Sequence, residues 1–183
     1  MANQIEKLNT IAIADIEKVD TLTDAQIEKI NTLNFLGVEP GQQVFTSSGT
    51  FTVPTGVTSV CVVCIAGGSG GDGVTLGESI RCGGGGGALQ YKNNISVTPG
   101  ASITVTCGAG GAGSTGHASE GNNSSFASDC VANAGTGGNS SGGGGGTGDG
   151  GGNGGSGACT AGGGGGAGGY AGDGGNGGEP AGN

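Results

Sequence analysis

The glycines in the C-terminal part of the chain are spaced at a regular interval, and this interval limits what the chain can fold into. From about Gly135 to Asn183, one non-glycine residue recurs at every third position, with mostly glycine between. The residues with this three-residue spacing are Ala167, Tyr170, Asp173, Asn176 and Glu179. The same spacing occurs earlier at Asn153, Ser156 and Cys159 and at Ala109, Ala112 and Thr115. Three residues per turn is the repeat of the polyproline-II conformation, which has no internal hydrogen bonds. The spacing therefore predicts three-fold helices with side chains along one edge and bare backbone along the other two.

Bare backbone edges let neighbouring helices of this kind approach closely and bond through their N–H and C=O groups. Three uninterrupted glycine runs, residues 83–87, 142–146 and 162–166, are predicted to be central helices that are bare on all sides. Each ordered glycine loses backbone freedom worth about 0.5–1 kcal/mol against alanine, whereas each hydrogen bond contributes about 0.5–1.5 kcal/mol. Order therefore requires a nearly complete lattice of hydrogen bonds. Without one, a tract this rich in glycine is a flexible tether.

Composition and charge narrow the class of protein. The chain has 183 residues, 50 of them glycine, with 3% aromatic residues and no tryptophan. This is too little large apolar side chain for an ordinary core, so we expect stability to come from backbone bonding, from oligomerisation or from both. The formal net charge is -9, and no Lys or Arg follows Lys92. Such a surface repels a phosphate backbone, which argues against nucleic acid as a partner.

The sequence predicts neither an export signal nor a membrane span. The N-terminal stretch MANQIEKLNT has no apolar segment of the kind found in secretion signals. The longest apolar run, residues 60–66, has the length of a strand and is too short to cross a bilayer. We therefore expect a soluble or particle-bound protein that does not insert into a membrane.

The six cysteines are far apart in the sequence, and their pattern does not require bridges. Cys61 and Cys64 match the C-x-x-C spacing, but they lie inside a strand-like run, where alternation places the two sulfurs on opposite faces. We expect both to be buried small apolar residues with free thiols in a reduced compartment, and we expect no metal site.

The first 37 residues contain an internal repeat with a step of eleven residues, whose units begin at Ile5, Ile16 and Ile27. Each unit predicts a short helical turn with a small apolar face, linked to the next by an extended piece. The alternative is one continuous helix forming a coiled-coil stalk, because eleven residues is also a supercoil period. Faces this small require a larger partner or further copies of the chain. The predicted anchoring or oligomer residues are Ile5, Leu8, Ile16, Val19, Ile27 and Ile30.

Residues 38–42 form a linker, after which the pattern of apolar residues has a period of two. A hairpin is predicted from residues 44–54, turning at Ser47, Ser48 and Gly49. Further strands are predicted at residues 60–65, 88–92, 95–97 and 102–107. Residues 43–183 are therefore predicted to be one domain, a small β-sandwich-like region continued by the glycine tracts.

Several stretches of this domain carry a family resemblance. They are FTVPTGVTSV at 51–60, AGG at 66–68, GGGGGA at 83–88, ISVTPG at 95–100 and ITVTCGAGG at 103–111. Together they resemble a glycine-rich domain of tailed-bacteriophage tail fibres and adhesins, over about residues 43–183. The resemblance implies mainly β structure plus polyglycine-II helices packed as a sandwich, with variable loops at one end contacting the host surface. The N-terminal repeats also look like short repeats that attach phage virion proteins to the particle.

The function implied by this resemblance is structural. We expect a short fibre or adhesin on the virion surface, anchored through its N-terminus to other virion proteins and projecting toward a host cell-surface receptor. A homo-oligomer is expected, with a trimer favoured, and neither enzymatic activity nor a cofactor is expected. Loops poor in aromatic residues leave open a capsid decoration protein, or head fibre, without receptor specificity. The other alternative, an extracellular glycine-rich structural protein, is expected to carry an export signal and a longer uniform repeat.

Motifs that suggest chemistry are weak in this context. Residues 108–113 fit G-x-G-x-x-G after a strand, but a loop-like sequence follows instead of a helix. Residues 145–149 come close to a calcium-binding nonapeptide, yet Asp149 and Asp173 are more simply solvated edges of three-fold helices.

Two stretches with diverse side chains interrupt the glycine pattern, at residues 72–81 and 117–133. Exposed loops with varied side chains are where recognition residues concentrate. The predicted receptor-contact residues are Asp72, Glu78, Arg81, His117, Glu120 and Phe126.

Overall fold

The computed structural model describes residues 29–30, 33–34, 41–73, 82–137, 141–160 and 162–179. The chain divides into two units, Met1–Gln42 and Gln43–Asn183. In the first unit, strand β1 (Lys29–Ile30) pairs antiparallel with β2 (Leu33–Asn34). The helical turn predicted from Ile27 is therefore wrong at residues 29–30, where the chain is extended and pairs with β2. The other anchoring residues, Ile5, Leu8, Ile16, Val19 and Ile27, lie outside the described residues.

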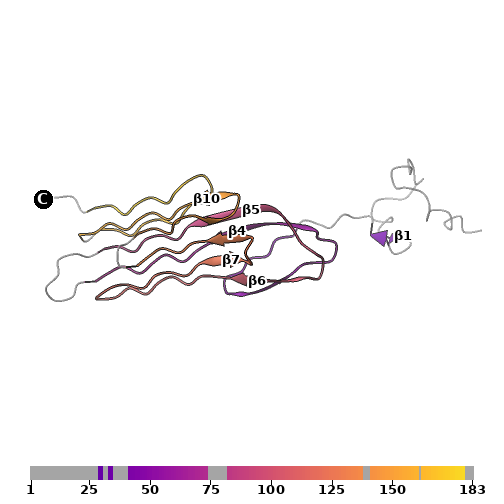
Figure 1. The fold of residues 1–183 in the computed structure, drawn as a ribbon, viewed down its shortest axis with the longest axis horizontal. Helices are drawn as coiled ribbons and strands as arrows, with labels where there is room; N and C mark the ends of the chain where they lie inside the picture. Colours follow the sequence, from indigo (N-terminus) through magenta and orange to yellow (C-terminus); the bar gives the residue numbers. More distant parts are fainter. Residues whose placement is uncertain are drawn as a thin grey trace, which may run out of the picture. The chain divides into compact units, whose positions relative to one another are not determined.

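The second unit is built mainly from β-strands in two antiparallel sheets, and its described residues include no helix (Figure 1). The three-stranded sheet has the order β10 (Gly150–Gly152), β5 (Leu89–Ser96), β4 (Ser59–Ile65). The five-stranded sheet has the order β3 (Gly49–Thr52), β6 (Ser102–Thr106), β7 (Ser124–Phe126), β8 (Cys130–Ala132), β9 (Gly146–Thr147). The mainly β fold class is thus confirmed.

A small core joins the two sheets. Its buried members are Cys64, Ala66, Ile95, Val105, Phe126, Cys130 and Ala132. The alternation predicted for residues 60–65 is confirmed, because Cys61 is exposed while Cys64 is buried in β4. The expectation that both cysteines are buried is therefore wrong for Cys61, which lies on the outward face of the strand. The predicted strand at 102–107 is confirmed as β6.

The hairpin predicted for residues 44–54 is wrong. Strand β3 pairs with the distant β6, with Phe51 opposite Ile103. The side-chain oxygen of Ser48 accepts a hydrogen bond from the Cys107 N–H at 3.0 Å and so holds the start of β3 beside the end of β6. The apolar side chain of Phe51 packs against the core in this pairing, which a local hairpin would not provide.

The two strands predicted within residues 88–97 form the single strand β5. The register against β4 shifts between Val60, which pairs with Ile95, and Val62, which pairs with Lys92. Asn94 lies in this irregularity with φ 53°. Asparagine is one of the few residues that adopts this left-handed conformation readily, so β5 bulges and continues where the sequence suggested a break.

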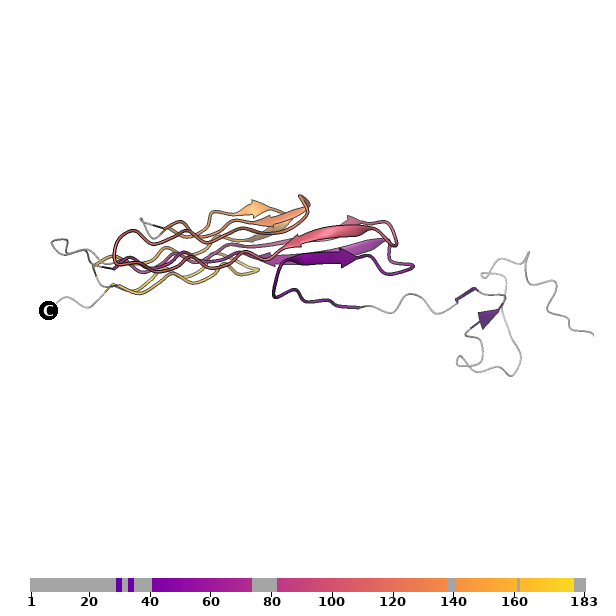
Figure 2. The same ribbon diagram turned by 90° about the horizontal axis from the view of Figure 1, so that it is seen from below.

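Beyond the strands, extended glycine segments continue to the opposite end of the second unit (Figure 2). Three successive carbonyls of one tract bond to three different segments. Gly84 accepts from the Gly165 N–H at 2.9 Å, Gly85 from Ser69 at 2.8 Å and Gly86 from Gly143 at 2.8 Å. The described part of the glycine-rich tail is therefore hydrogen-bonded in place, and it is not a free tether.

Burial in the segment after β10 follows the period of three that the glycine spacing predicts. Gly152, Gly155 and Ala158 are buried, while Asn153 and Ser156 are exposed. Two glycines and the small side chain of Ala158 face neighbouring segments, whereas the polar side chains of Asn153 and Ser156 face solvent, so the predicted period of three is confirmed here.

Only one of the three glycine runs is central. Residues 85–87 are buried, but Gly144, Gly163 and Gly164 are exposed. The prediction of central positions is therefore wrong for residues 142–146 and 162–166, which lie in outer layers of the second unit.

Candidate functional site

At the strand-free end of the second unit, described segments that are far apart in the sequence lie side by side (Figure 1). We call this group of residues the tip. Its described members are Asp72, Gly73, Cys82, residues 114–118, Cys159, Thr160 and Glu179.

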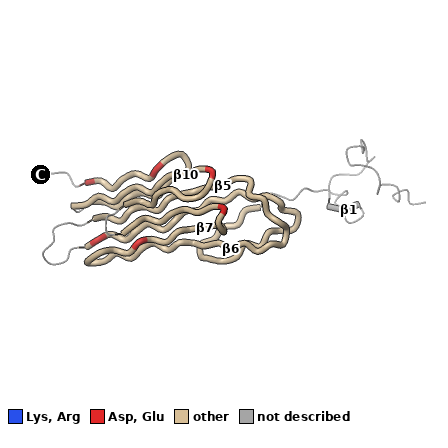
Figure 3. Tube along the Cα trace, in the orientation of Figure 1, with Lys and Arg blue, Asp and Glu red and all other residues tan. Residues whose placement is uncertain are grey.

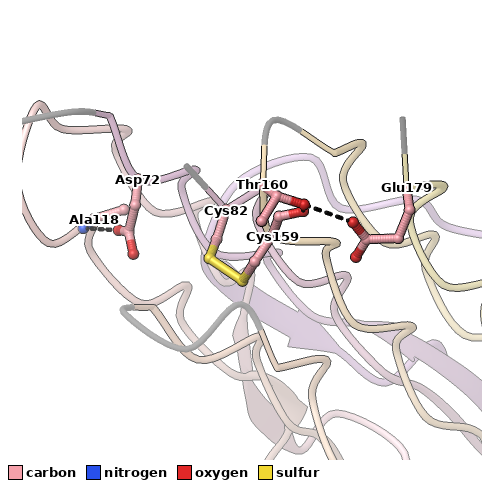
Figure 4. The surroundings of a disulfide bond; sticks show 6 residues. All are labelled: Asp72, Cys82, Ala118, Cys159, Thr160 and Glu179. Atoms are coloured by element: carbon pink, nitrogen blue, oxygen red, sulfur yellow. Dashed lines mark hydrogen bonds between the residues drawn. A yellow bond between two sulfur atoms is a disulfide. The ribbon is translucent and has the colours of Figure 1, made fainter. Parts of the chain in front are cut away.

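Asp72 connects two of the predicted receptor-contact stretches. Its carboxylate accepts a hydrogen bond from the Ala118 N–H (Figure 4). Its backbone N–H donates to the Cys82 carbonyl at 2.9 Å, and a parallel bridge links it to Ser114. The structure thus places Asp72 beside the turn that contains exposed His117, as expected for two loops that share one surface.

The remaining predicted contact residues have different outcomes. Glu78 and Arg81 lie outside the described residues. Glu120 is exposed, but its segment is bonded on both sides of it: the Ser119 N–H donates to Ala112 at 3.0 Å and the Asn122 N–H donates to Ala109 at 2.9 Å. This part of the chain is therefore fixed by the glycine segments rather than being a free loop.

The prediction that Phe126 is an exposed contact residue is wrong. Phe126 lies in β7 with 5% of its surface exposed, and its ring centroid is 5.8 Å from that of Phe51. In both short strands, residues 124–126 and 130–132, the two outer positions are buried and the middle one is half-buried. The sequences Ser-Ser-Phe and Cys-Val-Ala do not alternate polar with apolar residues, so no period-two pattern indicated these strands.

A disulfide joins Cys82 and Cys159 within the tip (Figure 4). The sequence pattern left the pairing of the cysteines open, and the structure joins these two, which are 77 residues apart in sequence. Next to it, the Thr160 hydroxyl donates a hydrogen bond to the Glu179 carboxylate at 2.9 Å. The tip is thus held by side chains from four segments of the chain and by the backbone N–H of Ala118 from a fifth.

The cysteines of the core are free thiols. The Cys64 thiol donates to the Cys130 carbonyl at 3.6 Å, and the Cys130 thiol donates to the Gln90 carbonyl at 3.5 Å. The hydrogen bond with the Cys130 side chain, followed by burial, raises the pKa of Cys64 far above its usual range. The same contact lowers the pKa of Cys130. At neutral pH the Cys64 sulfur is therefore protonated and shielded from solvent, which makes it a poor nucleophile.

Carboxylates are spread along the second unit (Figure 3). Asp149 accepts a hydrogen bond from the Asn93 N–H at 2.8 Å, and Asp173 accepts one from the Asn153 N–H at 2.7 Å. The prediction that Asp149 and Asp173 are merely solvated edges is therefore incomplete, because both bind backbone N–H groups. Among the described residues, no group of three or more His, Cys, Asp or Glu is arranged to hold a metal ion.

An exposed apolar surface on the three-stranded sheet was not predicted from the sequence. Val63 and Ile65 on β4 are 45% and 56% exposed, and Tyr170 is 62% exposed. Val63 pairs directly with Tyr91, whose ring centroid is 5.6 Å from that of Tyr170. We call these four residues the outer face. Alternation along β4 is the sequence signal for its aliphatic part.

No helix among the described residues is long and apolar enough to cross a membrane. In comparisons with known proteins, a family model described as a glycine-rich domain matches residues 46–183. No curated protein sequence matches the chain.

Proposed function

The chain belongs to the glycine-rich domain family through residues 46–183, and from this premise we propose that it is a structural protein of a tailed-bacteriophage virion. It is a short fibre or adhesin, attached to the particle by its N-terminal repeats and projecting the glycine-rich domain from the virion surface toward the host.

The observation that carries this proposal is the bonding of the glycine tract in three directions. The carbonyls of Gly84 and Gly87 both accept from one segment, through Gly165 at 2.9 Å and Gly168 at 3.0 Å, while Gly85 and Gly86 bond elsewhere. A bonding partner that recurs every three residues is the behaviour of a three-fold helix. We assign these segments to polyglycine-II helices, packed beside the sheets as the sandwich seen in phage fibre domains.

Such a lattice suits a projecting fibre. Its hydrogen bonds run between segments in several directions, so the domain resists bending without a large apolar core. The Cys82–Cys159 disulfide and the Asp72 contacts hold the turns at the far end. A surface exposed on a particle requires this kind of rigidity.

Attachment is assigned to the N-terminal repeats, residues 1–37. Their small apolar faces (Ile5, Leu8, Ile16, Val19, Ile27, Ile30) contact other virion proteins or one another, with a homotrimer as the favoured assembly. The protein is not an enzyme and needs no cofactor in this proposal, since the tip carboxylates of Asp72 and Glu179 bind groups of the chain itself.

A second candidate function is capsid decoration without receptor specificity. It is favoured by the burial of Phe126 in the core, because this leaves the described tip without an aromatic side chain for a receptor. In this case the glycine-rich domain is a rigid cover or short head fibre.

Immunogold electron microscopy of purified virions with an antibody against the full chain tests the proposal. Label at the tail supports a fibre or adhesin, and label over the capsid supports decoration. Particles without label would overturn both. A variant lacking residues 1–37 is expected to lose sedimentation with the particles while retaining the amide protection of the second unit, and undiminished binding would contradict anchoring through the repeats.

A further inference from the structure

Strands β5 and β10 begin an antiparallel ladder that continues past the end of the sheet. The last pair of the sheet is Leu89 with Gly152. Three residues further along both segments, the Gly86 N–H donates to the Gly155 carbonyl at 2.9 Å. The glycine segments therefore keep the register that the strands set.

The same register extends to the disulfide. The Gly83 N–H donates to the Ala158 carbonyl at 2.9 Å. The residues directly beyond this pair in the same register are Cys82 and Cys159, which are covalently joined. The ladder is thus fixed by the sheet at one end and by a covalent bond at the other.

Glycine alone does not specify this register. Residues 83–87 carry no side chains, and their partners recur every three residues, so a shift of three residues along the neighbouring segment regenerates equivalent backbone bonds. Segments without side chains on a buried face are known to specify register weakly. The tip, which lies furthest from the sheet, is where such a shift or fraying begins.

We propose that the Cys82–Cys159 disulfide is a redox latch that fixes the register of the glycine ladder and thereby orders the tip. The reduced chain forms the sheets and the inner part of the ladder, and the latch closes when the protein meets an oxidising environment. In the closing step, the two thiols exchange with a small-molecule disulfide such as oxidised glutathione. One S–S bond forms between Cys82 and Cys159, and the reagent leaves as two thiols carrying the two protons and two electrons.

Each cysteine also holds a neighbouring tip contact in place. The Cys82 carbonyl accepts the Asp72 N–H at 2.9 Å, and Asp72 in turn binds Ala118. Thr160, adjacent to Cys159, binds Glu179 at 2.9 Å. Opening the latch therefore frees both contacts at once (Figure 4).

The two bridged cysteines differ in their exposure to solvent. Cys82 is 8% exposed, whereas Cys159 is half-buried. A reducing thiolate therefore attacks the Cys159 sulfur and forms a mixed disulfide with it, while Cys82 leaves as a thiolate that takes up a proton. The second thiol of dithiothreitol then displaces Cys159 and closes the oxidised reagent, so both cysteines become free thiols. Because the departing Cys82 is shielded from water, which disfavours its charged form, we expect slow reduction of the folded protein.

Hydrogen exchange on the full-length protein tests the latch, before and after treatment with dithiothreitol under native conditions. We expect at least tenfold faster exchange of the Gly83, Asp72 and Ala118 amides after reduction, with the β4 amides unchanged. The C82S/C159S double variant is expected to behave like the reduced protein, and C61S, which removes an exposed free thiol, like the oxidised one.

Unchanged tip exchange after complete reduction would overturn the latch. Equal acceleration in β4 would also overturn it, because the disulfide would then support the whole domain rather than the tip. Thiol titration of the unfolded, air-oxidised protein must find the pair bridged, and six free thiols would contradict the proposal. If the double variant does not fold, hydrogen exchange of the reduced wild-type protein still tests the latch. No virion or host cell is involved, so the outcome is independent of the proposed function.

Discussion

The carboxylate of Asp173 accepts a hydrogen bond from the Asn153 N–H at 2.7 Å, and three residues further along both segments the Asn176 side-chain oxygen accepts from the Ser156 N–H at 2.9 Å. The intervening backbone follows the same step, since the Gly174 N–H donates to the Asn153 carbonyl at 2.8 Å. The side chains that interrupt the glycines thus satisfy the outermost N–H groups of the neighbouring segment. These groups would otherwise lack a partner within the lattice.

Replacing Asp173 with alanine is expected to destabilise the second unit by about 1 kcal/mol, because the Asn153 N–H loses its acceptor. The chain itself suggests the matched control, because the amide oxygen of Asn176 accepts the equivalent hydrogen bond from the Ser156 N–H. Asp173→Asn should therefore retain most of the stability. Urea unfolding of both variants measures the difference, and equal loss in the two would show that charge rather than hydrogen bonding is responsible.

The periodicities of the sequence predicted much of this fold. A period of three marked which positions after β10 face solvent, and a period of two marked the buried face of β4. Each pattern depends only on neighbouring residues, because the backbone conformation determines which side chains share a face.

Features that depend on distant partners were not predictable in the same way. The runs 83–87 and 162–166 have identical sequences, yet only the first is central, because burial depends on which segments surround it. The pairing of β3 with β6 and the Cys82–Cys159 bond likewise join residues far apart in the chain.

At the tip, the two predicted loops do meet through Asp72 and Ala118. Phe126 was wrongly predicted to be exposed because it follows Ser124 and Ser125 and precedes Ser128 and Asp129, so the stretch has no polar–apolar alternation that would indicate a strand. The aromatic part of the outer face is the contact between the rings of Tyr91 and Tyr170. These residues are far apart in the sequence, so no local pattern indicates that they meet.

Phe126→Ala is expected to destabilise the second unit by about 3–5 kcal/mol, because it empties a site in a small core and removes the contact with Phe51. His117→Ala, in the exposed turn of the same predicted loop, is expected to change stability by less than about 0.5 kcal/mol. The stability of both variants is measured by thermal unfolding, with circular dichroism as the signal. A neutral Phe126→Ala variant would contradict the placement of this ring in the core.

The free thiols are expected to react in a fixed order. Cys61 is exposed on β4, whereas Cys64 is buried and its pKa is raised, first by the hydrogen bond with Cys130 and then by burial. Because a raised thiol pKa leaves less thiolate at any given pH, iodoacetamide at pH 8 should modify Cys61 within minutes and Cys64 only after unfolding. Peptide mass spectrometry over time reads both sites. Rapid labelling of Cys64 in the folded protein would contradict its shielded, protonated state.

Two glycines provide the most direct test of the lattice. A Cβ at Gly86 would overlap the carbonyl group of Gly166, a backbone group that cannot turn away, whereas a Cβ at Gly175 meets nothing within 4 Å. Gly86→Ala is therefore expected to destabilise the second unit by about 3 kcal/mol or more, since the overpacking must be relieved by moving a whole segment. Gly175→Ala should be neutral or stabilising by up to about 1 kcal/mol, because alanine reduces the freedom of the unfolded chain. Chemical unfolding and hydrogen exchange at the neighbouring Gly155 amide compare the two variants. Equal tolerance of both substitutions would mean that residues 83–87 are not enclosed by other backbone segments, and the packed arrangement of glycine segments would have to be abandoned.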